Sequence, residues 1–207
     1  MSSLALNAAS LKYDNGFTAL KNVTAQFNSG SFTALVGPSG CGKSSLLRLL
    51  AGLEQPFIGS VTGLAQSQIG FVFQEPTLLA WRSVADNITL PLQIEGHSLN
   101  EIAARLDEAL ALVGLTDFAD ALPRQLSGGM KMRVSLARAL AKRPPVLLMD
   151  EPFAALDELT RFRLDDDLRA IWQQQKCTII FVTHSVTEAA YLAERALVMQ
   201  GGEIQKE

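Results

Sequence analysis

The chain has 207 residues and is 48% hydrophobic, enough for one domain with a sizeable core or for a core with one inserted lobe, and its 19% of charged residues excludes a disordered chain. Its formal net charge of −3 lacks the basic excess of proteins that bind DNA or RNA, so we expect no nucleic-acid partner. Two cysteines exclude a disulfide framework and favour a reducing compartment, and no apolar run reaches the roughly 18 residues that span a bilayer.

The N-terminal stretch alternates between apolar and polar side chains, which predicts strands. Turn residues at 15–16 and 28–30 separate the strands, and we expect them to form an antiparallel β segment. Two sets of apolar residues are each expected to share one strand face: Leu4, Leu6 and Ala8, and Val23, Ala25 and Phe27. Tyr13 is either an adenine-stacking residue or an ordinary surface aromatic, and we favour stacking.

Residues 37–44 read Gly-Pro-Ser-Gly-Cys-Gly-Lys-Ser and match the G-x-x-x-x-G-K-[ST] pattern of a phosphate-binding P-loop. An apolar strand at 32–36 precedes the loop and an apolar helix at 44–53 follows it, which is the context that the motif requires. Backbone N–H groups would cradle a triphosphate, Lys43 would reach its β- and γ-phosphates, and the Ser44 hydroxyl would ligate Mg²⁺. The expected nucleotide-binding residues here are Gly37, Pro38, Ser39, Gly40, Cys41, Gly42, Lys43, Ser44 and Ser45.

Three further apolar strands each end in polar residues that can act on a nucleotide. The strand at 69–73 ends at Gln74, the strand at 146–149 ends at Asp150 and Glu151, and the strand at 178–183 ends at His184. Ligands of open parallel sheets bind beyond the carboxyl ends of the strands. These three ends and the P-loop are therefore expected to converge on one site.

The residues at these strand ends suggest separate roles. Asp150 would hold the metal and Glu151 would polarise an attacking water, because alternation along the strand points the two side chains in different directions. His184 would sense the γ-phosphate, and the Gln74 amide would face the metal or the water. The competing interpretations are a pair of solvated acids and an ordinary loop histidine.

Residues 75–145 have a helical pattern, with a capping box formed by Ser98 and Glu101. We interpret this stretch as a helical lobe inserted into a sheet core of residues 1–74 and 146–207. Ser127, Gly128 and Gly129 begin a helix in the lobe and could bind a second set of phosphate oxygens, supplied by the nucleotide of another copy of the chain. Further on, the acidic run 165–167 is interpreted as a solvated helix face.

Taken together, the motifs predict an α/β P-loop NTPase of the RecA type, with a mostly parallel sheet core. The chain resembles the ATPase subunits of ABC transporters over nearly its whole length. Six segments carry the resemblance: Gly37–Ser44 (Walker A), Gln74 (Q-loop), Leu126–Gly129 (signature), Val146–Glu151 (Walker B), Ala155–Asp157 (D-loop) and His184 (switch histidine). The segment Phe73–Arg82 further resembles the nitrate, sulfonate and taurine importer group, and some pyrimidine-precursor importers.

The resemblance implies an ATPase that uses ATP and Mg²⁺ and works as a head-to-tail homodimer, with Asp157 near the nucleotide. It also implies two integral-membrane permease subunits, a separate solute-binding protein, and a peripheral location on the cytoplasmic face of the cell membrane. Two other interpretations stay open: a soluble ABC-type ATPase in DNA repair or translation, and an ATP-binding scaffold without turnover. The absence of tandem domains or long insertions argues against the first, and Glu151 and His184 argue against the second.

Overall fold

The computed structural model describes residues 4–63 and 68–207, and the chain divides into two compact units. The first unit holds the residues up to Phe71, Pro145–Glu151 and Gln175–Glu207. The second unit holds Val72–Pro144 and Pro152–Gln174. The inserted lobe expected at 75–145 stays a prediction about how the chain divides into domains.

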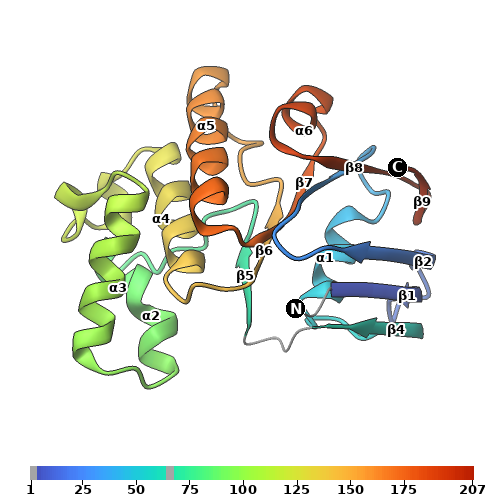
Figure 1. Ribbon diagram of the computed structural model, residues 1–207, viewed down its shortest axis with the longest axis horizontal. Helices are drawn as coiled ribbons and strands as arrows, with labels where there is room; N and C mark the ends of the chain where they lie inside the picture. The colour runs from blue at the N-terminus through green and yellow to red at the C-terminus, as the bar shows by residue number, and fades with distance from the viewer. Residues whose placement is uncertain (1–3, 64–67) are drawn as a thin grey trace. The chain divides into compact units, whose positions relative to one another are not determined.

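A six-stranded, mostly parallel sheet has the order β5-β6-β7-β3-β8-β9 (Figure 1). Strand β3 is parallel to β7 and β8, β6 is parallel to β7, and only the pairing of β8 with β9 is described as antiparallel. The strands are β3 Phe32–Val36, β5 Ile69–Val72, β6 Val146–Asp150, β7 Thr178–Thr183, β8 Arg195–Gln200 and β9 Glu203–Lys206. The expected parallel core is confirmed, and the strands that carry the P-loop, the paired acids and His184 are neighbours in it.

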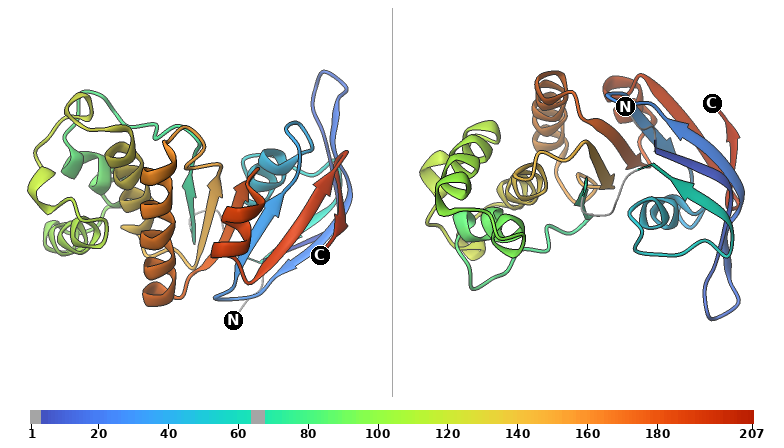
Figure 2. Two further views of the ribbon diagram at one scale, coloured as in Figure 1. Left: turned by 90° about the horizontal axis from the view of Figure 1, so that it is seen from above. Right: turned by 60° about the horizontal axis from the view of Figure 1, so that its bottom comes forward.

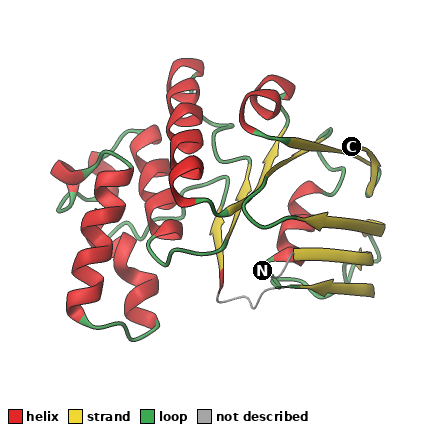
Figure 3. Cartoon of the chain, in the orientation of Figure 1, coloured by secondary structure: helices red, strands yellow, loops and turns green. Residues whose placement is uncertain are grey.

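A separate three-stranded antiparallel sheet has the order β2-β1-β4 (Figure 3). Its strands are β1 Leu4–Lys12, β2 Thr18–Phe27 and β4 Ile58–Thr62. The predicted faces are confirmed for β2 but not for all of β1, because Ala8 has a φ of 47° and a register shift separates Leu6 from Ala9. This bulge inserts one residue into the alternation, so Ala9 is buried instead of Ala8.

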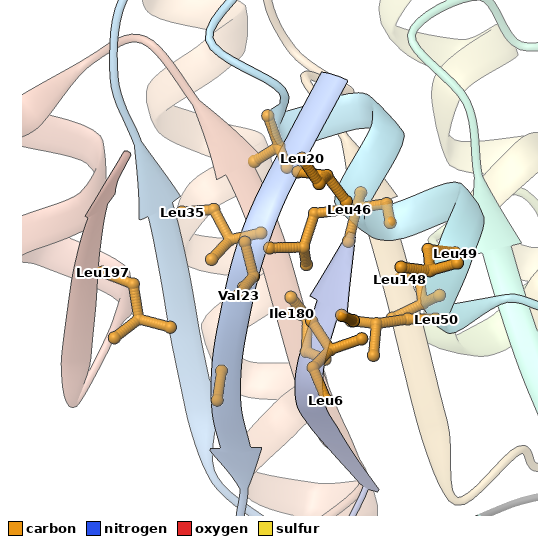
Figure 4. Close-up of a cluster of buried hydrophobic side chains, with 14 of the residues drawn as sticks. Leu6, Leu20, Val23, Leu35, Leu46, Leu49, Leu50, Leu148, Ile180 and Leu197 are labelled. Atoms are coloured by element: carbon orange, nitrogen blue, oxygen red, sulfur yellow. The ribbon is translucent and has the colours of Figure 1, made fainter. Parts of the chain in front are cut away.

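Helix α1 (Lys43–Leu50) packs into the main core of the first unit. The leucines that follow the P-loop have their side chains in a cluster with residues of β1, β3, β6, β7 and β8, and Figure 4 shows part of it. The buried leucines of the helix are Leu46, Leu47, Leu49 and Leu50. Because the helix is held on so many strands, the start of α1 is fixed relative to the strand ends. Helix α6 (Val186–Leu192) follows β7.

The second unit is helical and has its own core. It contains α2 (Val84–Ile94), α3 (Leu99–Leu112), the short 3₁₀ helices η2 (Thr116–Phe118) and η3 (Pro123–Gln125), α4 (Gly128–Leu140) and α5 (Glu158–Gln175) (Figure 2). Apolar side chains of α2, α3 and α4 form one buried cluster. The expected capping box of Ser98 and Glu101 begins α3, and Ser127 caps α4 as predicted.

The acidic run in α5 is not the solvated face that the sequence suggested. Asp165 is only 2% exposed, and it lies on the same helix face as the buried Leu164 and Leu168. Asp167 forms an ion pair with Arg133 of α4, at 2.7 Å between Nη2 and Oδ2. The interpretation was wrong for these two residues because helical spacing turns part of the run toward neighbouring helices.

Within the described ranges 4–63 and 68–207, no helix is both long and apolar enough to pass through a bilayer.

Candidate nucleotide site

The loop between β3 and α1 requires glycine at two places. A Cβ on Gly37 would lie 2.2 Å from the carbonyl oxygen of Met199, and one on Gly42 would lie 2.7 Å from the carbonyl oxygen of Ala19. Gly42 also has a φ of 106°, a conformation that L side chains rarely adopt, and it stands directly before the first residue of α1. The loop is thus held by close backbone approach at both ends. Its N–H groups and the helix start form a cradle that suits an anionic ligand.

Lys43 is folded back over this loop. Its side-chain nitrogen donates to the carbonyl oxygens of Gly37 at 2.8 Å and Pro38 at 3.1 Å, and the residue is only 5% exposed. A buried ammonium beside the cradle is the arrangement expected of a residue that binds phosphate. The residues therefore fit a triphosphate.

Ser44 and Asp150 lie side by side. The Ser44 hydroxyl donates to Oδ1 of Asp150 at 2.8 Å. Burial raises the pKa of Asp150, partly opposed by this hydrogen bond. Hydroxyl and carboxylate oxygens are ligands that Mg²⁺ accepts, and Mg²⁺ commonly completes its shell with water and phosphate oxygens. Within residues 4–63 and 68–207, no group of three or more acidic, histidine or cysteine side chains is placed to hold a metal ion.

Glu151 lies between Lys43 and His184. Its Oε1 is 3.7 Å from Lys43 Nζ, and its Oε2 is 3.3 Å from His184 Nδ1. The backbone of Glu151 has a φ of 44°, and its N–H donates to the carbonyl oxygen of Val182 at 3.0 Å. Asp150 and Glu151 make contacts with different partners, as expected, but the cause is the backbone conformation of Glu151 and not strand alternation. The resulting row of cation, carboxylate and imidazole suits proton transfer from a water near a phosphate to the carboxylate.

The backbone around His184 is held by a network of hydrogen bonds among Thr183, Ser185 and Glu188. The hydroxyl of Thr183 donates to the carboxylate of Glu188, and the Ser185 N–H donates to that same hydroxyl oxygen at 3.0 Å. The Ser185 hydroxyl in turn accepts from the Glu188 N–H at 3.2 Å. The backbone on both sides of His184 is therefore fixed, while the imidazole itself is 53% exposed. The only sequence signal for this network was a Glu three residues after the helix cap.

Tyr13 has a defined partner in the first unit. Its phenol oxygen lies 3.0 Å from Oγ of Ser45, next to the predicted metal ligand Ser44. This contact ties the turn after β1 to the start of α1. Stacking of Tyr13 on an adenine base stays a prediction.

The remaining candidates belong to the second unit. The Ser127 hydroxyl accepts from the Met130 N–H at 3.3 Å, so the segment Ser127–Gly129 opens α4. The Asp157 carboxylate accepts from the Thr160 N–H at 3.0 Å. A hydrogen bond with the Thr160 side chain, and then this backbone bond, lower the pKa of Asp157. Asp157 is thus engaged in capping the start of α5. Gln74 is exposed in the loop that follows β5.

The glycine loop after a buried strand, the buried lysine and the acids at the end of β6 define a P-loop nucleotide-binding protein. The family model of the ABC transporter matches residues 20–154, and the chain belongs to this family. It is an ABC transporter ATPase, which hydrolyses ATP. The expected fold is confirmed, with its parallel core, antiparallel sheet and helical part.

Two curated relatives match most of the chain. An aliphatic sulfonates import ATP-binding protein of Pseudomonas savastanoi is 47% identical over 184 residues, covering 89% of this chain and 75% of the relative. A nitrate import ATP-binding protein of Synechocystis is 46% identical over 198 residues, covering 91% and 74%.

Two solved structures of ATP-binding cassettes have the same fold as this chain. A dimeric post-hydrolysis state of an ATP-binding cassette bound to ADP and Pi superposes with a TM-score of 0.87 at 33% identity, covering 98% of this chain and 97% of the other. A Clostridium perfringens cassette, described as part of an ABC transporter complex, superposes with a TM-score of 0.90 at 28% identity, covering 98% and 86%.

Proposed function

We propose that the chain is the ATPase subunit of an importer for a small solute of the nitrate, sulfonate or taurine kind, or for a pyrimidine precursor. The observation that carries the proposal is 46% to 47% identity to import ATPases, over about nine-tenths of the chain. Those two relatives are named for nitrate and for sulfonates, which are both small oxyanions. The resemblance of Phe73–Arg82 to the same importer group supports this assignment.

In this proposal the first unit binds and cleaves ATP. The loop N–H groups and Lys43 would hold the β- and γ-phosphates, and Ser44 and Asp150 would hold Mg²⁺. Gln74, which belongs to the second unit, is proposed as a further ligand of the metal. The metal supplies charge neutralisation on the phosphate oxygens. Glu151 accepts a proton from the water whose oxygen bonds to the γ-phosphorus, while the bond from that phosphorus to the β–γ bridging oxygen breaks, giving ADP and phosphate. The 3.3 Å contact from Glu151 to His184 supports a shared role at the γ-phosphate.

The second unit acts on the nucleotide of another copy of the chain. Ser127 and Gly129 of one protomer face the γ-phosphate held by its partner, and Asp157 lies near the same interface. Tyr13, in the first unit, stacks on the adenine bound by its own chain. Two features support this arrangement: the N-terminus of α4, which attracts anions, and the dimeric state of the solved cassette with ADP and Pi.

The dimer drives two integral-membrane permease subunits, and a separate solute-binding protein delivers the solute to them. The chain is then peripheral, on the cytoplasmic face of the membrane. Trp81 is 76% exposed in the loop after Gln74, and an indole left in water is a strong candidate for a protein contact. The segment Gln74–Trp81 is the proposed docking site for the permease.

The proposal is tested by uptake in cells from which the gene has been deleted. We expect the deletion to abolish uptake of one labelled solute among nitrate, an alkanesulfonate, taurine and a pyrimidine precursor. The intact gene restores uptake, whereas a gene encoding Lys43→Ala does not, because the phosphate contact is lost. Undiminished uptake of all four solutes, or copurification with ribosomes or DNA instead of membrane subunits, would reject the import function.

A further inference from the structure

The loop between β5 and α2 carries an exposed tryptophan on a tightly held backbone. Trp81 is largely exposed to solvent, yet the residues on either side of it are bound through polar side chains of two helices. One of these side chains belongs to α2 and the other to α4. All of these residues lie in the second unit.

Asn87 of α2 holds the second half of the loop. It is 0% exposed, and its Oδ1 accepts from the Leu79 N–H at 2.7 Å. Its Nδ2 donates to the carbonyl oxygens of Leu79 at 3.1 Å, Arg82 at 3.1 Å and Ser83 at 2.9 Å. A buried amide is costly unless its hydrogen bonds are made, so the loop has to keep the shape that closes around Asn87.

Arg138 of α4 holds the first half. Its Nη1 donates to the Thr77 carbonyl at 2.9 Å, and its Nη2 donates to the Pro76 carbonyl at 2.9 Å and to Thr77 Oγ1 at 2.8 Å. Thr77 has a φ of 47°, which is unusual for a β-branched residue. Such a conformation persists only where neighbouring groups impose it, and the planar fork of Arg138 does so here. Burial also lowers the pKa of Arg138, so the guanidinium is partly desolvated for this contact.

The contacts of Asn87 and Arg138 with the loop form a clamp, and helix α4 connects this clamp to the signature segment. The helix begins at Gly128, directly after Ser127, and carries Arg138 near its other end. Helices α2 and α4 share the core cluster of the second unit, in which Ile88 and Val134 are fully buried. The loop, α2 and α4 are therefore bound to one another both by polar contacts and by packing.

We propose that Arg138 and Asn87 are positioning residues that fix the loop Pro76–Ser83 to helix α4, so that binding at Ser127–Gly129 is transmitted to Trp81. The nucleotide and the permease in this coupling rest on the proposed function. The clamp itself rests on the contacts above. In this arrangement Trp81 is the residue through which binding or release of the nucleotide changes the surface that contacts the permease.

The clamp is tested by hydrogen exchange in Arg138→Lys. A lysine keeps the charge but has no planar fork, so it cannot hold Pro76 and Thr77 together. We expect the amides of residues 77–82 to exchange about tenfold faster, as for a lost hydrogen bond to a charged group. The matched control is Arg143→Lys, since Arg143 is an exposed arginine of the same unit that pairs with Glu108. Unchanged exchange in Arg138→Lys, or equal acceleration in the control, overturns the clamp.

The coupling is tested by tryptophan fluorescence. Trp172→Phe leaves Trp81 as the single tryptophan of the chain, and Glu151→Gln is added to slow hydrolysis. We expect ATP to shift the Trp81 emission in this background, and we expect the shift to be lost when Arg138→Lys is added, with ATP affinity unchanged. An ATP-induced shift that survives Arg138→Lys overturns the coupling.

ATP affinity, measured with a fluorescent ATP analogue, separates the two proposals. If the background protein does not bind the analogue, the proposed function fails, while the exchange result still decides the clamp. Since Asn87→Ser can unfold the buried turn, it serves only as a second variant, and it supports the clamp if it folds and accelerates the same amides. If it folds and leaves those amides protected, the assignment of Asn87 is overturned.

Discussion

Glu151 obtains its direction from an unusual backbone conformation. Glu151 has a φ of 44° and does not continue strand β6, and its carboxylate contacts Lys43 and His184. Asp150 is the last residue of the strand and contacts Ser44. A non-glycine residue in this region costs on the order of 1–3 kcal/mol, and such strain is common at functional sites. At the residue scale, the separation of the proposed metal ligand from the proposed base is thus a backbone effect.

Replacing Glu151 with Gln tests the role of the carboxylate. The amide keeps the shape but cannot accept a proton, so we expect ATP to bind normally and to be hydrolysed at least about 100-fold more slowly, the low end of general-base effects. Phosphate release under single-turnover conditions measures this. Turnover at the wild-type rate would move the base to another residue.

Asp150→Asn tests the cost of burying the metal ligand. Because the pKa of Asp150 is raised in the folded chain, the stability linked to its protonation is present below the ordinary value of 3.8 and is lost as pH rises through the raised pKa. Removing the charge should therefore raise the melting temperature at pH 7, and each 1 kcal/mol of stability gained corresponds to about 2–4 °C in a chain of this size. The gain should shrink as the pH approaches 4.

The control for this comparison is Asp107→Asn, which changes an exposed carboxylate of α3 in the same way. A melting temperature of Asp150→Asn that is lower at pH 7 than at pH 4, relative to wild type, would contradict the stated sign. ATP turnover should be lost in Asp150→Asn and kept in the control.

The contact between α4 and α5 explains at the element scale why the signature segment ends in glycine. A Cβ on Gly129 would lie 2.7 Å from Cγ2 of Thr160, and one on Gly128 would lie 3.4 Å from Cδ2 of Leu156. Thr160 is itself fixed by the cap from Asp157. The signature segment and the D-loop are therefore packed as one structure within the second unit.

Gly129→Ala should destabilise the protein by about 1–3 kcal/mol, as overpacking of a closed contact does. Thr160→Ser removes the clashing methyl group, so the double variant should recover most of that loss. Urea denaturation measures both, with Gly128→Ala as the milder control. A double variant no more stable than Gly129→Ala would show that the contact with Thr160 is not the cause.

At the scale of the whole molecule, the two proposed phosphate-binding segments lie in different units of the chain. The P-loop, Asp150, Glu151 and His184 belong to the first unit, and Ser127–Gly129 belongs to the second. The proposed function brings them together between two copies. ATP binding by one chain and closure of the dimer are then separable events.

Ser127→Arg separates them experimentally. A long cationic side chain at the start of α4 should block the approach of the partner, while the P-loop of the same chain still binds ATP. We expect ATP affinity close to wild type and no ATP-dependent dimer by light scattering, with the Glu151→Gln background used to trap closure. An ATP-stabilised dimer of this variant would contradict the proposed arrangement.

Local information in the sequence was sufficient for most elements and for the nucleotide loop. The period of apolar residues predicted β3, β7 and α1, and Ser98 and Ser127 marked their helices, because these signals act within a few residues. The P-loop and the polar strand ends likewise carry their chemistry in adjacent positions, and parallel pairing alone brings the ends of β3, β6 and β7 to one edge.

Only the tertiary structure decided which polar groups form hydrogen bonds or ion pairs with one another. The bulge at Ala8, the burial of Asp165, the link from Glu151 to Lys43 and His184, and the hold of Arg138 on Thr77 each depend on a partner that is distant in sequence or on a register shift. Hydrophobic periodicity gives the face of an element but does not identify the neighbour that covers it. Those pairings are selected by the packing of the whole chain, since a buried polar group is stable only where its partner is also placed.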